Sequence, residues 1–90
     1  MATTTLGAGT ISKGQSVRWT WNFRGVGRGP FIVAAVPLPT QANDGLIRVV
    51  STGYETTSGG LSSNVFYSEF ADIFCEAGDL DYVMEVTDFV

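Results

Sequence analysis

The acidic residues in the second half of the chain are the first candidates for chemistry. Glu69, Asp72 and Glu76 follow at short spacing, and a suitably spaced pair of carboxylates can act as acid and base on a glycosidic bond. Such a pair needs a cleft, and 90 residues leave little room for one. The chain has no histidine, which excludes Ser-His-Asp, Cys-His and histidine-bound zinc sites. The sequence therefore predicts solvated surface acids and no enzyme.

A metal site is the next possibility. Asp79 and Asp81, with Asp72 or Glu76, offer the carboxylate oxygens that calcium prefers, although their spacing differs from that of an EF-hand loop. Cys75 is the single cysteine, so the chain has no intrachain disulfide and no four-thiolate zinc site. We interpret the acids as an ordinary acidic turn, retain Asp72, Asp79 and Asp81 as calcium candidates, and predict no cofactor. Cys75 is predicted to be a small buried hydrophobic residue.

Two other groups of residues are candidates for binding a ligand. Arg24 and Arg28 enclose glycines in the segment 25–30, and guanidinium groups with backbone N–H groups suit a phosphate, sulfate or carboxylate. The spacing matches neither a Walker motif nor a dinucleotide motif, and the alternative is a loop that contacts a partner. The second group could stack against sugars and should be partly exposed, because tyrosine tolerates one wet end. Its members are Tyr54, Tyr67 and Tyr82.

The two tryptophans could also stack against a sugar. Trp19 and Trp21, however, alternate with polar residues and share one strand face with Val17 and Phe23. A stripe of this kind is typical of the buried face of a strand. We therefore predict that Trp19 and Trp21 belong to the core.

Charge is divided unevenly along the chain. All five basic residues precede Tyr54 and eight of the nine acidic residues follow it. Strands from the two parts would mix the signs if they pair, and this is the preferred interpretation. If they do not, copies of the chain could attract head to tail through a basic and an acidic end. The isoelectric point near 4.4 disfavours nucleic acid as a partner.

The elements that must position these residues are predicted to be strands of one small domain. Val, Thr, Gly and aromatic residues are plentiful, which suits strands joined by tight turns. The predicted strands are 3–12, 16–24, 31–36, 46–55 and 82–89, with turns at 13–15, 40–45 and 78–81 and loops at 25–30 and 56–63. The fold class is therefore all-β, a small antiparallel β-sandwich of about six to seven strands, immunoglobulin-like or jelly-roll-like.

Two of these strands carry specific expectations. The segment 3–12 is rich in Thr and Gly and is predicted to be an edge strand with a bulge near Gly7 or Gly9. The segment 31–36 is continuously apolar and is predicted to be a central strand covered on both faces, ended by Pro37.

The segment 64–77 admits two interpretations. On a helix, its apolar residues fall on one side and its acids on the other, and Gly78 stands where a cap would. On a strand, each face mixes apolar with acidic residues, so an outward aromatic residue or a bulge is needed. Context favours the strand, because 64–77, the turn at 78–81 and the strand 82–89 would form a closing hairpin. The alternative is an α+β domain with one amphipathic helix at 64–77.

The sequence of elements resembles a known class of modules. A glycine turn, a tryptophan-containing strand, a proline-ended apolar strand and a closing hairpin are similar to short immunoglobulin-like or fibronectin-type sandwiches. The paired cysteines of immunoglobulin domains are missing. The resemblance implies a sandwich and no particular function.

Bulk composition bears on the partners. The mean hydropathy of +0.18 and a charged fraction of 16% are apolar for so small a domain, which predicts a homo-oligomer. No apolar run reaches the roughly 18 residues that span a bilayer, and the start lacks the features of a signal peptide, so no membrane partner is expected. We expect a binding module that contacts a protein or carbohydrate through the loops 25–30 and 56–63. The alternative is a structural subunit that assembles through strand edges and complementary charge.

Overall fold

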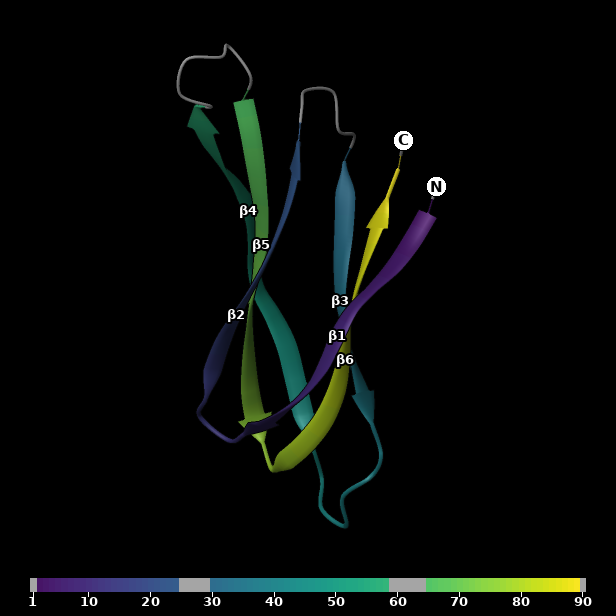
Figure 1. Ribbon diagram of the computed structural model, residues 1–90. Coiled ribbons are helices and arrows are strands. Elements are labelled where there is room, and N and C mark those ends of the chain that lie inside the picture. The colour runs from purple at the N-terminus through teal and green to yellow at the C-terminus, as the bar shows by residue number, and fades with distance from the viewer. Residues whose placement is uncertain (1, 25–29, 59–64, 90) are drawn as a thin grey trace.

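The chain folds into two facing antiparallel sheets of three strands each (Figure 1). A computed structural model describes residues 2–24, 30–58 and 65–89. Its strands are β1 (Ala2–Ser12), β2 (Ser16–Arg24), β3 (Phe31–Leu38), β4 (Leu46–Ser58), β5 (Val65–Ala77) and β6 (Asp79–Asp88). One sheet has the order β1-β6-β3 and the other β2-β5-β4. The predicted all-β sandwich is confirmed.

The two central strands, β5 and β6, supply most of the core. Each lies between two neighbours in its sheet, and each alternates buried and half-buried residues along most of its length, as period-two side-chain geometry requires. The buried apolar residues are Ile11, Val33, Ala71, Ile73, Cys75, Leu80, Tyr82, Met84 and Val86. Cys75 is fully buried with no disulfide partner, so its predicted role as a buried hydrophobic residue is confirmed.

The segment 64–77 is a strand, and the helical alternative is wrong. Phe70 and Phe74 lie on the outer face, where Arg18 and Arg48 stack over their rings at 4.1 and 5.5 Å from the ring centroids. These contacts cover much of the aromatic surface and supply cation–π attraction. The strand therefore tolerates outward aromatic residues, which were the main sequence argument for a helix.

The predicted closing hairpin of β5 and β6 is wrong. The two strands belong to different sheets and do not pair, because the chain passes from one sheet to the other through Gly78, which has a φ of 72°. The turn between β1 and β2 also changes sheets, and Gly14 there has a φ of 86°. The two turns are joined by hydrogen bonds from Lys13 N to Gly78 O and from Gly14 N to Cys75 O, both 2.8 Å long.

The prediction that 31–36 is a central strand ended by Pro37 is also wrong, and β3 continues through Pro37 to Leu38. β3 is an edge strand that pairs with β6 alone among the described strands. Val33 is buried, but Ile32 on the opposite face is 59% exposed. A continuous apolar run is typical of a strand covered on both faces, and in the single chain one of these faces is uncovered.

The remaining predicted strands are present, although β6 begins at Asp79, inside the segment 78–81 that was predicted to be a turn. The segment 3–12 is an edge strand with a register irregularity between Thr5 and Gly7. The turn at 13–15 closes with a 3.0 Å hydrogen bond from Gln15 N to Ser12 O, and the predicted strand 46–55 extends to Ser58. The predicted loop 56–63 therefore begins as strand, while 59–63 and most of 25–30 lie outside the described residues.

The chain shares the two-sheet sandwich with immunoglobulin-like modules, but the number of strands in its sheets differs. Here each sheet has three strands, whereas an immunoglobulin constant domain has four and three. The part of the chain that is described contains no helix long and apolar enough to cross a membrane.

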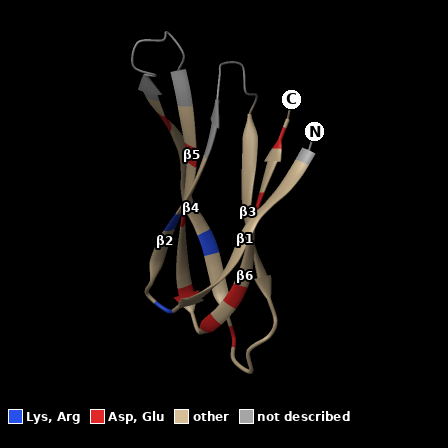
Figure 2. Ribbon diagram, in the orientation of Figure 1, with Lys and Arg blue, Asp and Glu red and all other residues tan. Residues whose placement is uncertain are grey.

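Strand pairing mixes the two charged parts of the sequence. Figure 2 shows basic residues of β2 and β4 beside acidic residues of β5. Arg18 forms an ion pair with Asp72 at 2.7 Å, and Arg48 forms one with Glu76. The interpretation of an ordinary mixed surface is therefore confirmed for these pairs, which join the basic first part to the acidic second part.

Candidate functional site

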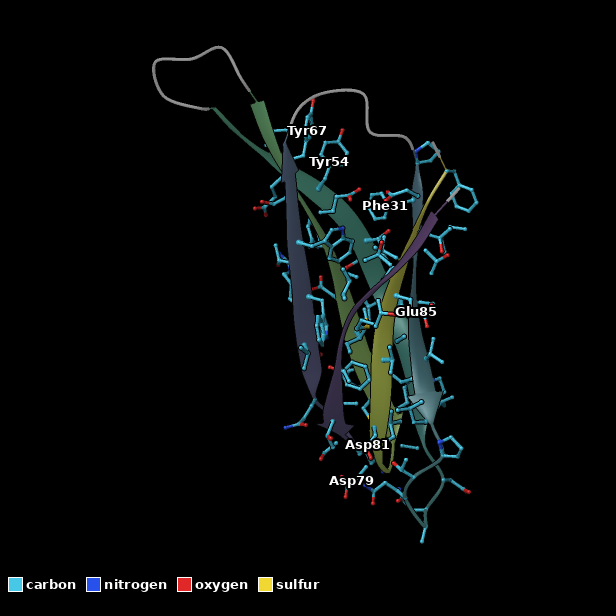
Figure 3. The ribbon with its side chains drawn as sticks, turned by 45° about the vertical axis from the view of Figure 1, so that its right-hand side comes forward. Phe31, Tyr54, Tyr67, Asp79, Asp81 and Glu85 are labelled. Carbon is cyan, nitrogen blue, oxygen red and sulfur yellow. The ribbon has the colours of Figure 1, made fainter. Side chains whose placement is uncertain are left out.

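The aromatic side chains of Phe31, Tyr54 and Tyr67 lie near the end of the sandwich that carries both termini (Figures 1 and 3). Tyr54 packs against Tyr67 with ring centroids 5.9 Å apart and an interplanar angle of 60°. Trp21 meets Phe31 edge to face at 6.0 Å and 86°, and this contact joins the two sheets because Trp21 belongs to β2 and Phe31 to β3. We call Trp21, Phe31, Tyr54 and Tyr67 the aromatic site.

Strand register brings most of this site together. Trp21 on β2 and Tyr54 on β4 both lie opposite Glu69 of β5, so the three residues form one row across the sheet. Tyr67 stands two residues before Glu69 and shares its face. Side chains directly or diagonally opposite on neighbouring strands are within reach of aromatic rings, which explains the contact between Tyr54 and Tyr67.

Glu69 anchors the row from within. Its side chain is 2% exposed, and its Oε1 accepts a 3.0 Å hydrogen bond from the indole Nε1 of Trp21. A buried carboxylate without hydrogen bonds is costly, and this bond also fixes the orientation of the indole. Glu69 is therefore a positioning residue for the aromatic site.

The exposed surface of the site belongs mainly to Tyr54, which is 63% exposed. Tyr67, Trp21 and Phe31 are half-buried. Aromatic faces carry partial negative charge that attracts polarised C–H groups, and the phenol groups add hydrogen-bonding oxygens. The arrangement suits a ligand with an apolar face and a polar rim.

Of the predicted sugar-stacking residues, the structure brings together Tyr54 and Tyr67 and separates Tyr82. The expectation that Tyr82 is partly exposed is wrong, since it is 2% exposed and its hydroxyl accepts a 3.0 Å hydrogen bond from Trp19 Nε1. The hydroxyl of Tyr82 needs no contact with water, because the indole N–H of Trp19 supplies its hydrogen bond. Trp19 and Trp21 pack against the core, as predicted, although Trp21 also borders the aromatic site.

The predicted arginine site falls mostly outside the described residues. Arg28 lies in the undescribed segment 25–29, and only the backbone of Arg24, at the end of β2, is described.

The three calcium candidates do not meet. Asp72 lies on the outer face of the β2-β5-β4 sheet with Arg18 and Ser51. Asp81, on the other sheet, accepts hydrogen bonds from Thr10 at 2.6 Å and from Thr40, and Asp79 is exposed at the start of β6. Within the described ranges no three metal-ligating residues stand together.

Sequence reasoning did not identify Phe31 as a site residue, and its prediction that Glu69 is a solvated surface acid is wrong, because Glu69 is buried on the inner face of β5. Glu69 falls in phase with Ala71, Ile73 and Cys75, which a strand would bury together. An acidic residue in an otherwise buried row was the available signal. No signal in the local sequence marks Phe31, because its partner in the site, Trp21, belongs to the other sheet.

The ion pair of Asp72 predicts an acid-dependent loss of stability. Arg18 and Ser51 donate hydrogen bonds to this carboxylate and lower its pKa from 3.8 to about 2. A lowered pKa favours the folded state above pH 3.8, and this contribution is lost as the pH falls from about 4 to about 2. We expect NMR titration of the Asp72 carboxyl to give a midpoint well below 3.8.

Two variants test this assignment. Ser51→Ala removes the 2.8 Å hydrogen bond to Asp72 Oδ2 and should move the midpoint upward. Asp72→Asn should make the melting temperature less dependent on pH over the same acidic range. A wild-type midpoint at the ordinary value of 3.8 would contradict the assignment.

Comparisons of the chain with protein-family models, curated proteins and solved structures give no match.

Proposed function

We propose that this protein is a non-catalytic carbohydrate-binding domain and that the aromatic site binds the sugar. The observation that carries the proposal is the ring of Tyr54, 63% exposed and packed edge-on against Tyr67. An exposed aromatic ring that continues into further packed aromatic rings offers a contiguous apolar surface to a ligand. The ring face of a pyranose offers the C–H groups that such a surface attracts, and its hydroxyl groups form the polar rim.

The strands beneath the site support a rigid platform. Trp21 and Tyr54 flank Glu69 in register, and the indole bond to the buried Glu69 carboxylate limits rotation of Trp21. Tyrosine in particular provides a large contact area with few rotatable bonds, so little conformational entropy is lost on binding. Sites held by strands are also positioned more precisely than sites on loops.

Replacing Tyr54 tests the proposal. The experiment is a glycan array with the full chain, followed by calorimetric titration of the best glycan. Tyr54→Ala should weaken binding about tenfold or more, because loss of a central aromatic contact typically costs upward of about 1–2 kcal/mol. Tyr54→Phe keeps the ring and should retain most of the affinity.

Leu46→Ala is the matched control. Leu46 begins the same strand, β4, and is 53% exposed, yet it lies far along the strand from Tyr54. This variant should bind the glycan as the wild type does. An array on which no glycan binds, or a glycan whose affinity is unchanged by Tyr54→Ala, would overturn the proposal.

A further inference from the structure

The outer face of β3 is apolar and uncovered in the single chain. Ile32, Val36 and Leu38 are exposed to 59%, 37% and 37%, and Ala34 between them is exposed as well. On the same strand Val33 is buried on the inner face. The sequence of β3 is thus that of a strand covered on both faces, although it occupies an edge.

The free edge of β3 presents a row of backbone groups. The hydrogen bond from Phe89 N to Pro30 O is 2.9 Å long, so residue 30 directs its carbonyl toward the continuation of β6. Alternation then directs the even residues of β3 toward β6 and the odd residues outward. The outward N–H groups belong to Phe31, Val33 and Ala35. Pro37 also faces outward, so its missing N–H costs no bond within the sheet.

The other edge strands carry bulges or charges along their length, whereas β3 has only Pro37 near its end. β1 is interrupted between Thr5 and Gly7, and β4 has two register irregularities and carries Arg48 and Glu55. The outer face of β2 carries Arg18. Bulges and charges are the usual devices that keep an edge from pairing with another chain. β3 has neither over its eight residues.

We propose that two copies of this chain pair antiparallel through β3, about a two-fold axis at Val33. In this register Val33 faces Val33 of the second copy, and Phe31 faces Ala35. All three outward N–H groups of each copy find a carbonyl, which gives about six hydrogen bonds. The result is one six-stranded sheet with the order β1-β6-β3-β3-β6-β1.

The strand that pairs with this edge is β3 of a second copy, because β3 is complementary to itself. The strand carries no charge, so the two-fold axis brings no like charges together. Ile32 lies opposite Ala34 of the second copy, where a large residue meets a small one, and Val36 lies diagonal to Ile32. Pro37 falls beyond the paired residues, so its missing donor marks the end of the pairing.

Sedimentation equilibrium of the full chain tests the pairing. We expect a reversible monomer–dimer equilibrium between micromolar and millimolar protein. Ala35→Pro removes an N–H group that has no partner in the monomer, so it should leave the monomer folded and weaken the dimer about tenfold or more. Ile32→Lys, which places a charge on the apolar outer face, should also weaken the dimer.

Leu46→Lys is the control for added charge, because Leu46 is 53% exposed on β4. It should leave the dimer intact. A wild-type chain that stays monomeric throughout, a dimer unaffected by both β3 variants, or assembly into open-ended filaments would each overturn the proposal. Circular dichroism of dilute samples checks that the variants fold.

Disulfide trapping tests the register. Ile32 and Ala34 of the second copy form a non-hydrogen-bonded pair with a Cα separation of about 4.5 Å, which a disulfide can bridge. The double variant Ile32→Cys/Ala34→Cys should therefore form a covalent dimer on mild oxidation. In Ile32→Cys/Val36→Cys the cysteines are not opposite each other in this register, so this variant should form no interchain disulfide. The reverse pattern would overturn the two-fold at Val33, and neither outcome depends on sugar binding.

Discussion

Gly78→Ala is expected to lower the free energy of unfolding by about 3 kcal/mol or more, as several costs combine at this residue. Gly78 has a φ of 72°, a conformation that L-residues adopt only at a cost of about 1–2 kcal/mol. A Cβ there would also run into the backbone oxygen of Asp44 and the side-chain nitrogen of Asn43. Both atoms are held, because Asn43 Nδ2 donates to Asp44 O at 2.9 Å and to Asp79 O at 3.2 Å.

Gly14→Ala is the matched comparison for this prediction. Gly14 has a similar φ of 86°, but a Cβ there would meet nothing within 4 Å. The variant should therefore lose only the backbone cost of about 1–2 kcal/mol. Urea unfolding of both variants separates conformational cost from steric clash. Equal losses for the two variants would show that the contacts between Gly78 and 43–44 do not constrain the turn.

The long-range contacts around Gly78 explain why the sequence wrongly predicts a closing hairpin. A glycine with aspartates after it is typical of a hairpin turn, and the local sequence gives no sign that the next strand joins the opposite sheet. That choice depends on contacts made 30 or more residues away in sequence, at Asn43 and Asp44. Local pattern therefore predicted the turn and could not predict the topology.

Alternation predicted individual strands well where one face is buried and the other polar. The strand 16–24 has this pattern, and its predicted bounds are those of β2. The apolar run 31–36 was correctly assigned to a strand but wrongly to the centre of a sheet. Hydrophobic periodicity indicates that a strand face is suited to burial, but it does not indicate which element or partner covers that face.

The candidate site was only partly predictable for a similar reason. Tyr54 and Tyr67 were identified by residue type, but their contact depends on the register of β4 against β5, which includes two irregularities. Tyr82 has the same residue type and lies in the core because Trp19 supplies its hydrogen bond. Exposure of a tyrosine is thus decided by partners on other strands.

Truncating Ile73 to alanine is expected to cost about 2–5 kcal/mol in the free energy of unfolding. Ile73 is fully buried at the centre of β5, opposite Val17 on β2 and Val49 on β4. Both neighbours are fixed by backbone pairing with β5, so they cannot move inward to fill the space. The cost therefore includes a cavity term besides the lost transfer free energy of the side chain.

Two further substitutions define the scale for this measurement by urea unfolding. Ile73→Val removes one methylene group and should cost about 0.5–1.5 kcal/mol, while Leu46→Ala at a 53% exposed position should change stability by about 0.5 kcal/mol or less. If Ile73→Ala cost no more than Leu46→Ala, the two sheets would not be packed through β5. The core would then have to lie elsewhere, and the burial of Glu69 beneath the aromatic site, which depends on the same strand, would lose its support.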